Sequence, residues 1–289
     1  MQRSMGGGDR CGGGAAGYSA GLYSSRMGLR TLLLEQMMPG GQIVNAENIE
    51  NYLGFPEGIM GAELAGLMQK HASQFGLSEK VLEITSIEPA RPYWNVSTTH
   101  GTFQTKVVII ATGSTMRKLG VSGEDELFGS GVSQCATCDG SFFINQVVGV
   151  VGGGDSALDE ALVLTKFASK ILMFCRENEF SGQKVLQERV RSQKKIEFFL
   201  NTVVTAIHGD SEVVGVSLIS SITGKASKIG LSGLFVHIGL VPNSDFISEL
   251  VPLDAGGHIP TDKWMRTAIP GILAAGDVRE HSASQLIAS

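Results

Sequence analysis

The sequence of 289 residues lacks several features that would assign it to common classes of protein. No apolar run approaches the roughly 20 residues that a membrane-spanning helix needs, so we expect no membrane segment. The net charge is −5 and no long basic run occurs, which argues against a nucleic-acid partner. The opening residues MQRSMGGGDRCGGG have no apolar core like that of a secretory signal peptide, so a cytoplasmic location is the default expectation.

Cysteine is also scarce, and its four positions are too few for a disulfide framework in a chain of this length. Cys135 and Cys138 stand in the stretch QCATCDG, with Asp139 directly after the second. Such a C-x-x-C pair can close a disulfide that an external thiolate attacks. Two alternatives are an inert buried pair and half of a zinc site. Zinc needs four ligands, however, and the sequence has no second C-x-x-C and no pair of histidines at metal spacing, so we expect no metal.

Glycine, in contrast, is abundant. Its 38 positions are nearly double the roughly 7% of average proteins. They cluster at Gly6–Gly17, Gly40–Gly41 and Gly152–Gly154, which indicates tight turns rather than a flexible linker.

Two of these clusters have the spacing of dinucleotide-binding turns. The residues GGGAAG from Gly12 fit G-x-G-x-x-G, and we expect a helix over Ala15–Met27 and a strand over Thr31–Glu35 to follow. Glycine lets a diphosphate approach the backbone, and a helix N-terminus offers free N–H groups and partial positive charge. The alternative interpretation is that these glycines only make tight turns.

The second cluster begins a similar unit. The residues GGGDSA from Gly152 fit G-x-G-x-x-A between an expected strand Val147–Val151 and a helix reaching Ala168, with a strand Ile171–Phe174 beyond it. Glu160 on that helix is either a partner of the nucleotide site or an ordinary solvated residue. Two such βαβ units are much stronger evidence for dinucleotide binding than one.

Further elements follow from apolar periodicity. We expect a helix over Met60–Phe75, buried strands over Lys106–Gly113 and Ile272–Val278, and a pair of strands over Val213–Ser220 and Lys228–His237. His237 stands in an apolar run, and we expect it to be a core histidine with satisfied hydrogen bonds.

Together these motifs resemble the low-molecular-weight thioredoxin reductases, which are FAD-containing pyridine nucleotide-disulfide oxidoreductases. The resemblance covers nearly the whole chain, and CATCDG is its most specific element. It rests on GGGAAG (Gly12–Gly17), GGQ (Gly40–Gln42), ENYLGFP (Glu50–Pro56), ATG (Ala111–Gly113), CATCDG (Cys135–Gly140), GGGDSALDEA (Gly152–Ala161) and GILAAGDVR (Gly271–Arg279).

The resemblance implies an α/β fold with two Rossmann-like dinucleotide-binding domains of three-layer ββα type. A discontinuous FAD domain would comprise residues 1–113 and 244–289, and a central NAD(P)-type domain over residues 114–243 would carry the cysteines. The implied function is that of a flavoprotein disulfide reductase. Electrons would pass from a donor through FAD to the Cys135–Cys138 pair and on to a thioredoxin-like protein, in a homodimer.

The resemblance also implies individual roles. Cys138 would receive electrons from the flavin, Cys135 would attack the partner's disulfide, and Asp139 would exchange protons with the sulfurs. Glu35 would accept hydrogen bonds from the adenosine ribose, and Asp277 would contact the ribityl chain. The implied FAD residues are Gly12, Gly14, Gly17, Glu35, Gly40, Gly41, Gln42, Asn51, Ala111, Thr112, Gly113, Gly276, Asp277 and Gln285, and those for the nicotinamide nucleotide are Gly152, Gly154, Ser156, Ala157 and Arg176.

One departure from the family concerns the electron donor. The family marks its NADPH phosphate pocket with H-R-R-x-x-x-R, whereas this chain has CRENEFS over Cys175–Ser181. Arg176 is retained, but Glu177 places a negative charge where phosphate would lie, and Ser181 replaces the last arginine. NADPH is therefore disfavoured, and NADH or a protein donor such as reduced ferredoxin stays open.

Two further departures lie in the FAD domain. Residues 1–11 contain no apolar strand before the first glycine turn, and Ser284–Gln285 stands where the family has an Arg-Gln pair and a long helix. We therefore expect the second part of the FAD domain to be truncated. A non-catalytic redox or nucleotide-binding module that has lost FAD is the alternative that these departures leave open.

Overall fold

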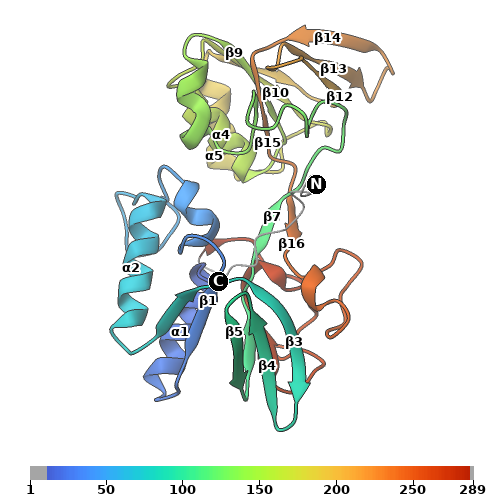
Figure 1. The fold of residues 1–289 in the computed structure, drawn as a ribbon. Helices are drawn as coiled ribbons and strands as arrows, with labels where there is room; N and C mark the ends of the chain where they lie inside the picture. The colour runs from blue at the N-terminus through green and yellow to red at the C-terminus, as the bar shows by residue number, and fades with distance from the viewer. Residues whose placement is uncertain (1–11, 287–289) are drawn as a thin grey trace. The chain divides into compact units, whose positions relative to one another are not determined.

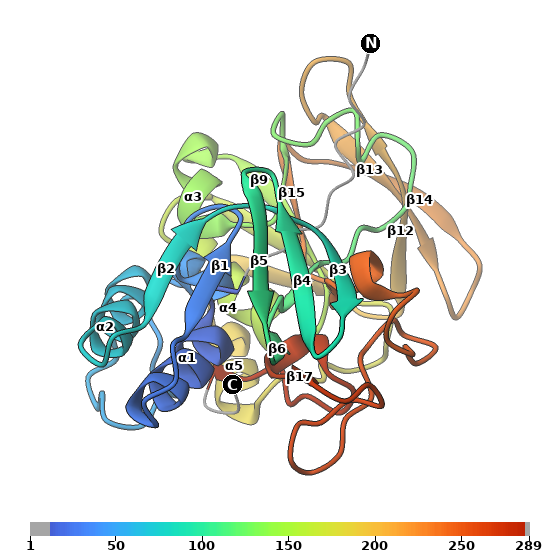
Figure 2. The same ribbon diagram turned by 60° about the horizontal axis from the view of Figure 1, so that its bottom comes forward.

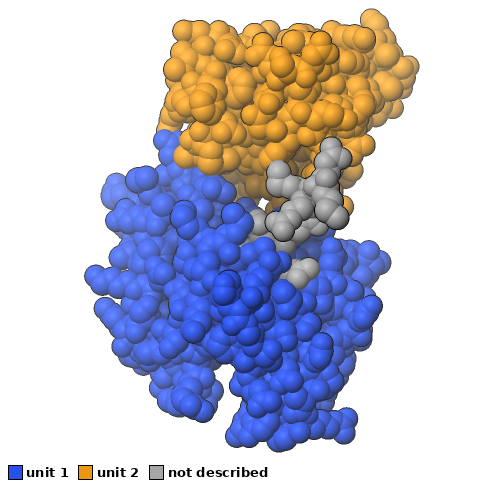
Figure 3. Space-filling model, viewed as in Figure 1, with its two compact units in different colours: residues 1–115, 241–289 blue, residues 116–240 orange. Residues whose placement is uncertain are grey.

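A computed structural model describes residues 12–286 of the chain. The chain divides into two compact units, residues 1–115 with 241–289 and residues 116–240 (Figure 3). The domain limits expected from the sequence, after residues 113 and 243, lie within three residues of this division. The fold is α/β with parallel sheets, as predicted. Residues 1–11, where the sequence predicts no strand, lie outside the described part.

Unit 2, residues 116–240, is built on a five-stranded parallel sheet in the order β11-β10-β9-β15-β8. The apolar runs VVGVV and KILMF become the adjacent strands β9 and β10 and are buried on both faces, as parallel strands require. The strands are β8 (Val132–Ser133), β9 (Val147–Val151), β10 (Lys170–Phe174), β11 (Ile196–Phe199) and β15 (Gly233–Val236).

The two faces of this sheet carry different layers (Figures 1 and 2). Ile171 and Met173 of β10 pack into the core beneath helices α4 (Asp155–Leu164) and α5 (Lys184–Ser192). Leu172 and Phe174 point the opposite way, into a second core. That core is covered by an antiparallel sheet of β12 (Thr202–His208), β13 (Gly215–Ser220) and β14 (Ala226–Gly230). Side chains of one strand alternate between faces, so this unit has the expected three-layer ββα arrangement.

The prediction of one strand over Lys228–His237 is wrong. The segment divides into β14, which pairs with β13, and β15, which joins the parallel sheet beside β9. All four residues of β15 are buried, whereas β14 carries polar, exposed residues, so each part suits a different layer. A Cβ on Gly233 would lie 2.5 Å from the Phe143 ring, so the glycine permits the chain to enter the sheet there.

Unit 1 contains the first glycine turn and its following elements. The predicted helix after the turn is confirmed as α1 (Ala15–Arg26), and the strand as β1 (Leu32–Glu35). Strand β1 pairs in parallel with β2 (Ser78–Val81), and α2 (Gly61–Ser73) packs with α1 through a cluster of Tyr18, Leu33, Ala72 and Leu77. A short 3-10 helix, η1 (Gly41–Asn45), lies between β1 and α2.

The two parts of the chain that form unit 1 meet in one core. Strand β6 (Val108–Ile110) pairs in parallel with β17 (Ile272–Ala274) from the C-terminal part. An antiparallel sheet of β3 (Ile84–Ala90), β4 (Tyr93–Thr98) and β5 (Gly101–Thr105) packs on the same core. The strand predicted over Ile272–Val278 stops at Ala274, because Gly276 has a φ of +74° and begins the 3-10 helix η4 (Gly276–Val278).

Two short strands connect the units. Strand β7 (Ser114–Met116) and strand β16 (Leu240–Pro242) form a two-stranded sheet with each other. Within residues 12–286, no helix combines the length and apolar character needed to cross a bilayer.

Phe174 tests the core of unit 2. Its side chain is fully buried at the end of β10, with the Phe199 ring centroid 5.4 Å away. We expect Phe174→Ala to lower the free energy of unfolding by about 3–5 kcal/mol, because it removes buried area and leaves a cavity. Urea denaturation measures this loss. Ile222→Ala, at a side chain that is 74% exposed, serves as the control and should cost less than about 0.5 kcal/mol. Equal losses for the two variants would contradict the assigned core.

Candidate active site

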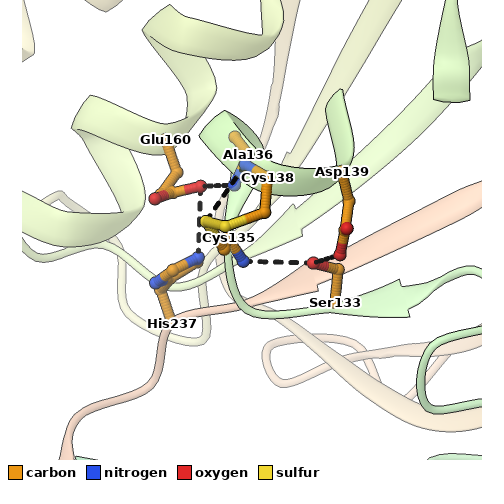
Figure 4. Close-up of a disulfide and its surroundings, with 7 residues drawn as sticks. All are labelled: Ser133, Cys135, Ala136, Cys138, Asp139, Glu160 and His237. Carbon is orange, nitrogen blue, oxygen red and sulfur yellow. Dashed lines mark hydrogen bonds and ion pairs between the residues drawn. A yellow bond between two sulfur atoms is a disulfide. The ribbon is translucent and has the colours of Figure 1, made fainter. Parts of the chain in front are cut away.

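The cysteine pair lies at the start of a short helix, α3 (Ala136–Asp139), directly after β8 (Figure 4). Cys135 and Cys138 form a disulfide across this turn. Cys135 occupies the N-cap position, and its Sγ accepts a hydrogen bond from the backbone N–H of Cys138 at 3.1 Å. The turn therefore already offers one N–H donor to a sulfur that becomes a thiolate when the disulfide opens.

Ser133 connects Asp139 to the cysteine turn. The buried Ser133 hydroxyl donates to Asp139 Oδ2 at 2.6 Å and accepts the N–H of Cys135 at 3.1 Å (Figure 4). One hydroxyl thus links the carboxylate to the backbone of the first cysteine. Ser133 is not among the residues predicted from the sequence, where its only signal is a hydroxyl residue two positions before Cys135.

Glu160 approaches the same turn from α4. One of its carboxylate oxygens, Oε2, accepts the backbone N–H of Ala136, between the two cysteines (Figure 4). Burial raises the pKa of Glu160 to about 7; the Ala136 N–H opposes this rise, and the charges of Asp159 and Asp139 add to it. Glu160 is therefore not an ordinary solvated helix residue. Its hydrogen bond is to the cysteine turn rather than to the glycine turn of the predicted nucleotide site. Its signal in the sequence is its place three residues after Ala157, on the buried stripe that continues to Ala161 and Leu164.

His237, in the segment after β15, lies beneath the pair with its side chain fully buried. Its Nε2 is 3.7 Å from Glu160 Oε2, which is beyond hydrogen-bond distance. Burial lowers the pKa of His237 to about 4, so the ring is neutral at neutral pH. The prediction of a core histidine is confirmed, but the prediction that its hydrogen bonds are satisfied is wrong, because neither ring nitrogen has a hydrogen-bond partner within residues 12–286.

The turn between β9 and α4 has the features of a diphosphate cradle. A Cβ on Gly152 would lie 2.1 Å from the carbonyl oxygen of His237, so strand and turn approach too closely for any side chain. No side chain caps α4 at Gly154, and a Cβ there would meet only Ser181 Oγ at 3.9 Å. Ser156 is exposed and Ala157 is buried in the first turn of α4. The backbone donors at this helix N-terminus fit the diphosphate of a dinucleotide.

The loop after β10 closes over this turn. Asp155 accepts hydrogen bonds from the backbone N–H and the side-chain amide of Gln183, both at 2.7 Å. Ser181 bonds the carbonyl oxygen of Gly153 through its backbone N–H at 2.9 Å and its hydroxyl at 3.3 Å. Exposed Arg176 donates from Nε to Glu177 Oε1 at 2.8 Å, so the arginine that the family motif retains is already paired with a carboxylate.

The first glycine turn, in unit 1, repeats this design. A Cβ on Gly17 would lie 1.5 Å from the carbonyl oxygen of Gly12, so α1 touches the start of the turn directly. No side chain caps α1 at Gly14, and a Cβ there would meet only Gly41 Cα, at 3.9 Å. The backbone N–H of Gly40 bonds the carbonyl oxygen of Gly13 at 2.8 Å, which brings the GGQ segment to the turn.

Other predicted FAD residues of unit 1 converge on the same region. Gln42 donates to the carbonyl oxygen of Ser114 at 3.1 Å, directly after the predicted Ala111–Gly113 segment. A Cβ on Gly276 would lie 2.7 Å from the Ala16 side chain, so the C-terminal part reaches α1. Two further hydrogen bonds join predicted residues of the same unit: Thr112 donates to the carbonyl oxygen of Asn243 at 2.7 Å, and Asn51 donates to Gln285 at 3.2 Å.

Two predicted carboxylates have partners of their own. Fully buried Glu35 accepts the backbone N–H groups of Gly13 at 2.7 Å and Met37 at 3.0 Å, one on each oxygen. Asp277 accepts the hydroxyl of Ser282 at 2.9 Å. A carboxylate has about four acceptor positions, so Asp277 keeps capacity for a ligand hydroxyl, whereas the Glu35 carboxylate is enclosed and holds the turn. With the open N-terminus of α1, this donor and acceptor set fits FAD.

Comparison with known proteins agrees with this geometry. The family described as "Pyridine nucleotide-disulphide oxidoreductase" matches residues 11–289. The chain is 42% identical over 277 residues to "Thioredoxin reductase" of Listeria monocytogenes, covering 96% of this chain and 86% of the relative. It is 40% identical over 278 residues to "Bifunctional thioredoxin reductase/thioredoxin" of Mycobacterium leprae, covering 96% of this chain and 61% of that protein. The crystal structure of Lactococcus lactis thioredoxin reductase aligns with a TM-score of 0.94 at 41% identity, covering 96% of this chain and 92% of that one.

Gly14 tests the cradle in unit 1. Its backbone has ordinary extended angles, so a larger side chain is tolerated there but projects in front of the helix N-terminus. We expect Gly14→Val to weaken FAD affinity at least about tenfold, equal to about 1.4 kcal/mol, while the chain stays folded. Fluorescence titration of the cofactor-stripped chain with FAD gives the affinity. Gly66→Ala, on α2 where a Cβ meets nothing within 4 Å, is the control and should leave FAD binding unchanged. Unchanged FAD affinity in Gly14→Val would place the diphosphate elsewhere.

Proposed function

Because the chain belongs to the pyridine nucleotide-disulphide oxidoreductase family and is a flavoprotein disulfide reductase of the thioredoxin reductase type, we propose that it passes electrons from NADH to a thioredoxin-like protein. The electrons would travel through FAD to the Cys135–Cys138 disulfide. The observation that carries this proposal is the disulfide itself, closed at the N-terminus of α3 with the Asp139 carboxylate tethered beside it.

Residues of this chain perform the thiol half of the reaction. Bound FAD supplies two electrons from the donor to the disulfide. In our proposal Cys138 receives them, and Cys135, whose sulfur accepts the Cys138 N–H, becomes the thiolate that attacks the partner's disulfide. Asp139, held by Ser133, exchanges protons with the sulfurs.

The choice of NADH over NADPH rests on the Arg176–Glu177 pair. A 2′-phosphate binds through charge-assisted hydrogen bonds to arginine. Here the Arg176 guanidinium donates to Glu177 at 2.8 Å, and a phosphate arriving beside it would also face the Glu177 charge. NADH carries no such phosphate and avoids this repulsion. The same pair favours a second candidate donor, a reduced ferredoxin, which would not use the nucleotide turn.

The proposed partner is a thioredoxin-like protein. The name of the Mycobacterium leprae relative, "Bifunctional thioredoxin reductase/thioredoxin", joins the two activities in one protein, which supports this choice. A homodimer and a cytoplasmic location complete the proposal, by similarity to the family. Stopped-flow reduction of the flavin by NADH, NADPH and reduced ferredoxin, followed at about 450 nm, tests the donor directly.

Cys138→Ser tests the path of electrons. We expect the variant to bind FAD and to be reduced by the donor, while reduction of thioredoxin disulfide falls to background, because serine cannot form the disulfide. Insulin reduction coupled to thioredoxin measures turnover. Cys175→Ala, at the free buried cysteine of the same unit, is the matched control and should retain turnover. Normal turnover in Cys138→Ser would rule out the assigned path.

The double variant Glu177→Arg with Ser181→Arg tests donor selection. It restores two cations at the end of β10, so we expect the ratio of kcat/KM for NADPH to that for NADH to rise at least about tenfold, or about 1.4 kcal/mol. Steady-state kinetics with both nucleotides provides this ratio. Glu179→Arg, an equally exposed position on the same loop, controls for a general change of charge. A similar rise in the control, or none in the double variant, would locate phosphate recognition elsewhere.

A further inference from the structure

Glu160 contacts the cysteine turn but has no part in the electron path described above. We propose that Glu160 is a positioning residue that couples proton uptake to the reduction of the Cys135–Cys138 disulfide. In the disulfide state its carboxylate holds the Ala136 amide, and when the pair is reduced it takes up a proton. The inference rests on the disulfide reductase function and adds a proton path to it.

The Glu160 carboxylate lies at the cysteine turn. Glu160 reaches from α4 to the N–H of Ala136, which directly follows Cys135 in the chain (Figure 4). Its side chain is only 16% exposed, so water contributes little to the solvation of a negative charge there. A charged Glu160 therefore depends on the Ala136 N–H, and any new negative charge beside the turn destabilises it.

Reduction of the disulfide creates a negative charge on a cysteine sulfur. Opening the disulfide leaves a sulfur at Cys135 that accepts the Cys138 N–H, and this donor favours the thiolate form. Ala136 links this sulfur's residue to the Glu160 carboxylate. Two negative charges in one partly desolvated site repel each other, so reduction makes Glu160 bind its proton more tightly.

The other ionisable groups around Glu160 add to this effect or are neutral. His237 lies 3.7 Å away from the segment after β15, and burial keeps the pKa of its ring low, so the ring supplies no positive charge at neutral pH. Asp139 on α3 and Asp159 on α4 are both acidic and raise the pKa of Glu160. In this environment the proton, rather than a counter-ion, neutralises Glu160.

Above the pKa of Glu160 in the disulfide state, the oxidised site contains the disulfide and one ionised carboxylate. Two electrons and two protons convert these to one thiol, one thiolate and one protonated Glu160, and the S–S bond breaks. The reduced flavin supplies the electrons in the working enzyme, and solvent supplies the protons. Without the carboxylate, the same two electrons need only one proton.

The extra proton therefore appears in the pH dependence of the disulfide's midpoint potential. One proton per two electrons changes the potential by about 30 mV per pH unit. Burial raises the pKa of Glu160 to about 7 in the disulfide state, so the extra proton is counted only above that pH. Below pH 7 the carboxyl is protonated in both redox states and contributes no slope. The plot of potential against pH should thus steepen near pH 7.

The experiment equilibrates the full FAD-supplemented chain with dithiothreitol redox buffers from pH 6 to pH 9 and counts thiols by maleimide labelling. We expect the wild-type plot above pH 7 to be about 30 mV per pH unit steeper than that of Glu160→Gln, and the two slopes to agree below pH 7. Glutamine keeps an acceptor for the Ala136 N–H but cannot ionise. Asp159→Asn, which removes a carboxylate from the same helix, is the matched control: it should keep a break of the same size, moved to a lower pH because the Asp159 charge no longer raises the pKa of Glu160.

A straight wild-type plot, or an identical break in Glu160→Gln, would overturn the inference. The wild-type plot decides alone if the glutamine variant fails to fold. The chemical reductant also separates this test from the proposed function: a chain that shows the break but does not reduce thioredoxin keeps the inference and refutes the partner. A chain that reduces thioredoxin but shows no break refutes the inference on Glu160 and keeps the proposed function.

Discussion

The closeness of backbone to backbone at two glycine turns is the constraint on which both units depend. In unit 1 the carbonyl oxygen of Gly12 lies where a Cβ of Gly17 would be, and in unit 2 the carbonyl oxygen of His237 lies where a Cβ of Gly152 would be. Any side chain at these two glycines would push helix and strand apart. Because the contact is this close, the N-termini of α1 and α4 stay open, without a side-chain cap, at the carboxyl edge of their sheets.

Helix α4 connects the nucleotide turn to the cysteine pair. Its N-terminus forms the glycine turn, and Glu160, in its second turn, reaches the amide between the two cysteines. His237 contributes to both places as well, since its carbonyl oxygen lies against Gly152 of the turn and its ring faces Glu160. The cysteine pair and the second glycine turn are thus held by the same two elements, α4 and the segment after β15.

The sequence predicts well the features that depend on residues close together in the chain. The glycine turns, α1, β9 and β10 follow from spacing and apolar runs within short windows, and the C-x-x-C motif identifies its own disulfide. The error over Lys228–His237 arose because two strands with different surroundings were taken as one. The exposed β14 and the buried β15 belong to different sheets, and the fit of Gly233 against Phe143 that permits this change is not visible in the sequence. Ser133 is near its partners Cys135 and Asp139 in sequence, but a lone serine carries no motif that predicts this contact. The ring of His237, which has no hydrogen-bond partner within residues 12–286, could not be predicted because it faces Glu160 of α4, which is distant in sequence. The FAD and nucleotide contacts themselves stay predictions.

The pairing of β7 with β16 has a consequence for how the two units are joined in one chain. Unit 2 begins and ends on these two neighbouring strands, with the N–H of Arg117 bonded to the carbonyl oxygen of Gly239 at 2.9 Å. A domain whose ends are adjacent can be inserted into a surface loop of another without breaking the host's core. The central unit therefore has the adjacent ends that let one domain be accommodated within another, with β7 and β16 as the paired entry and exit.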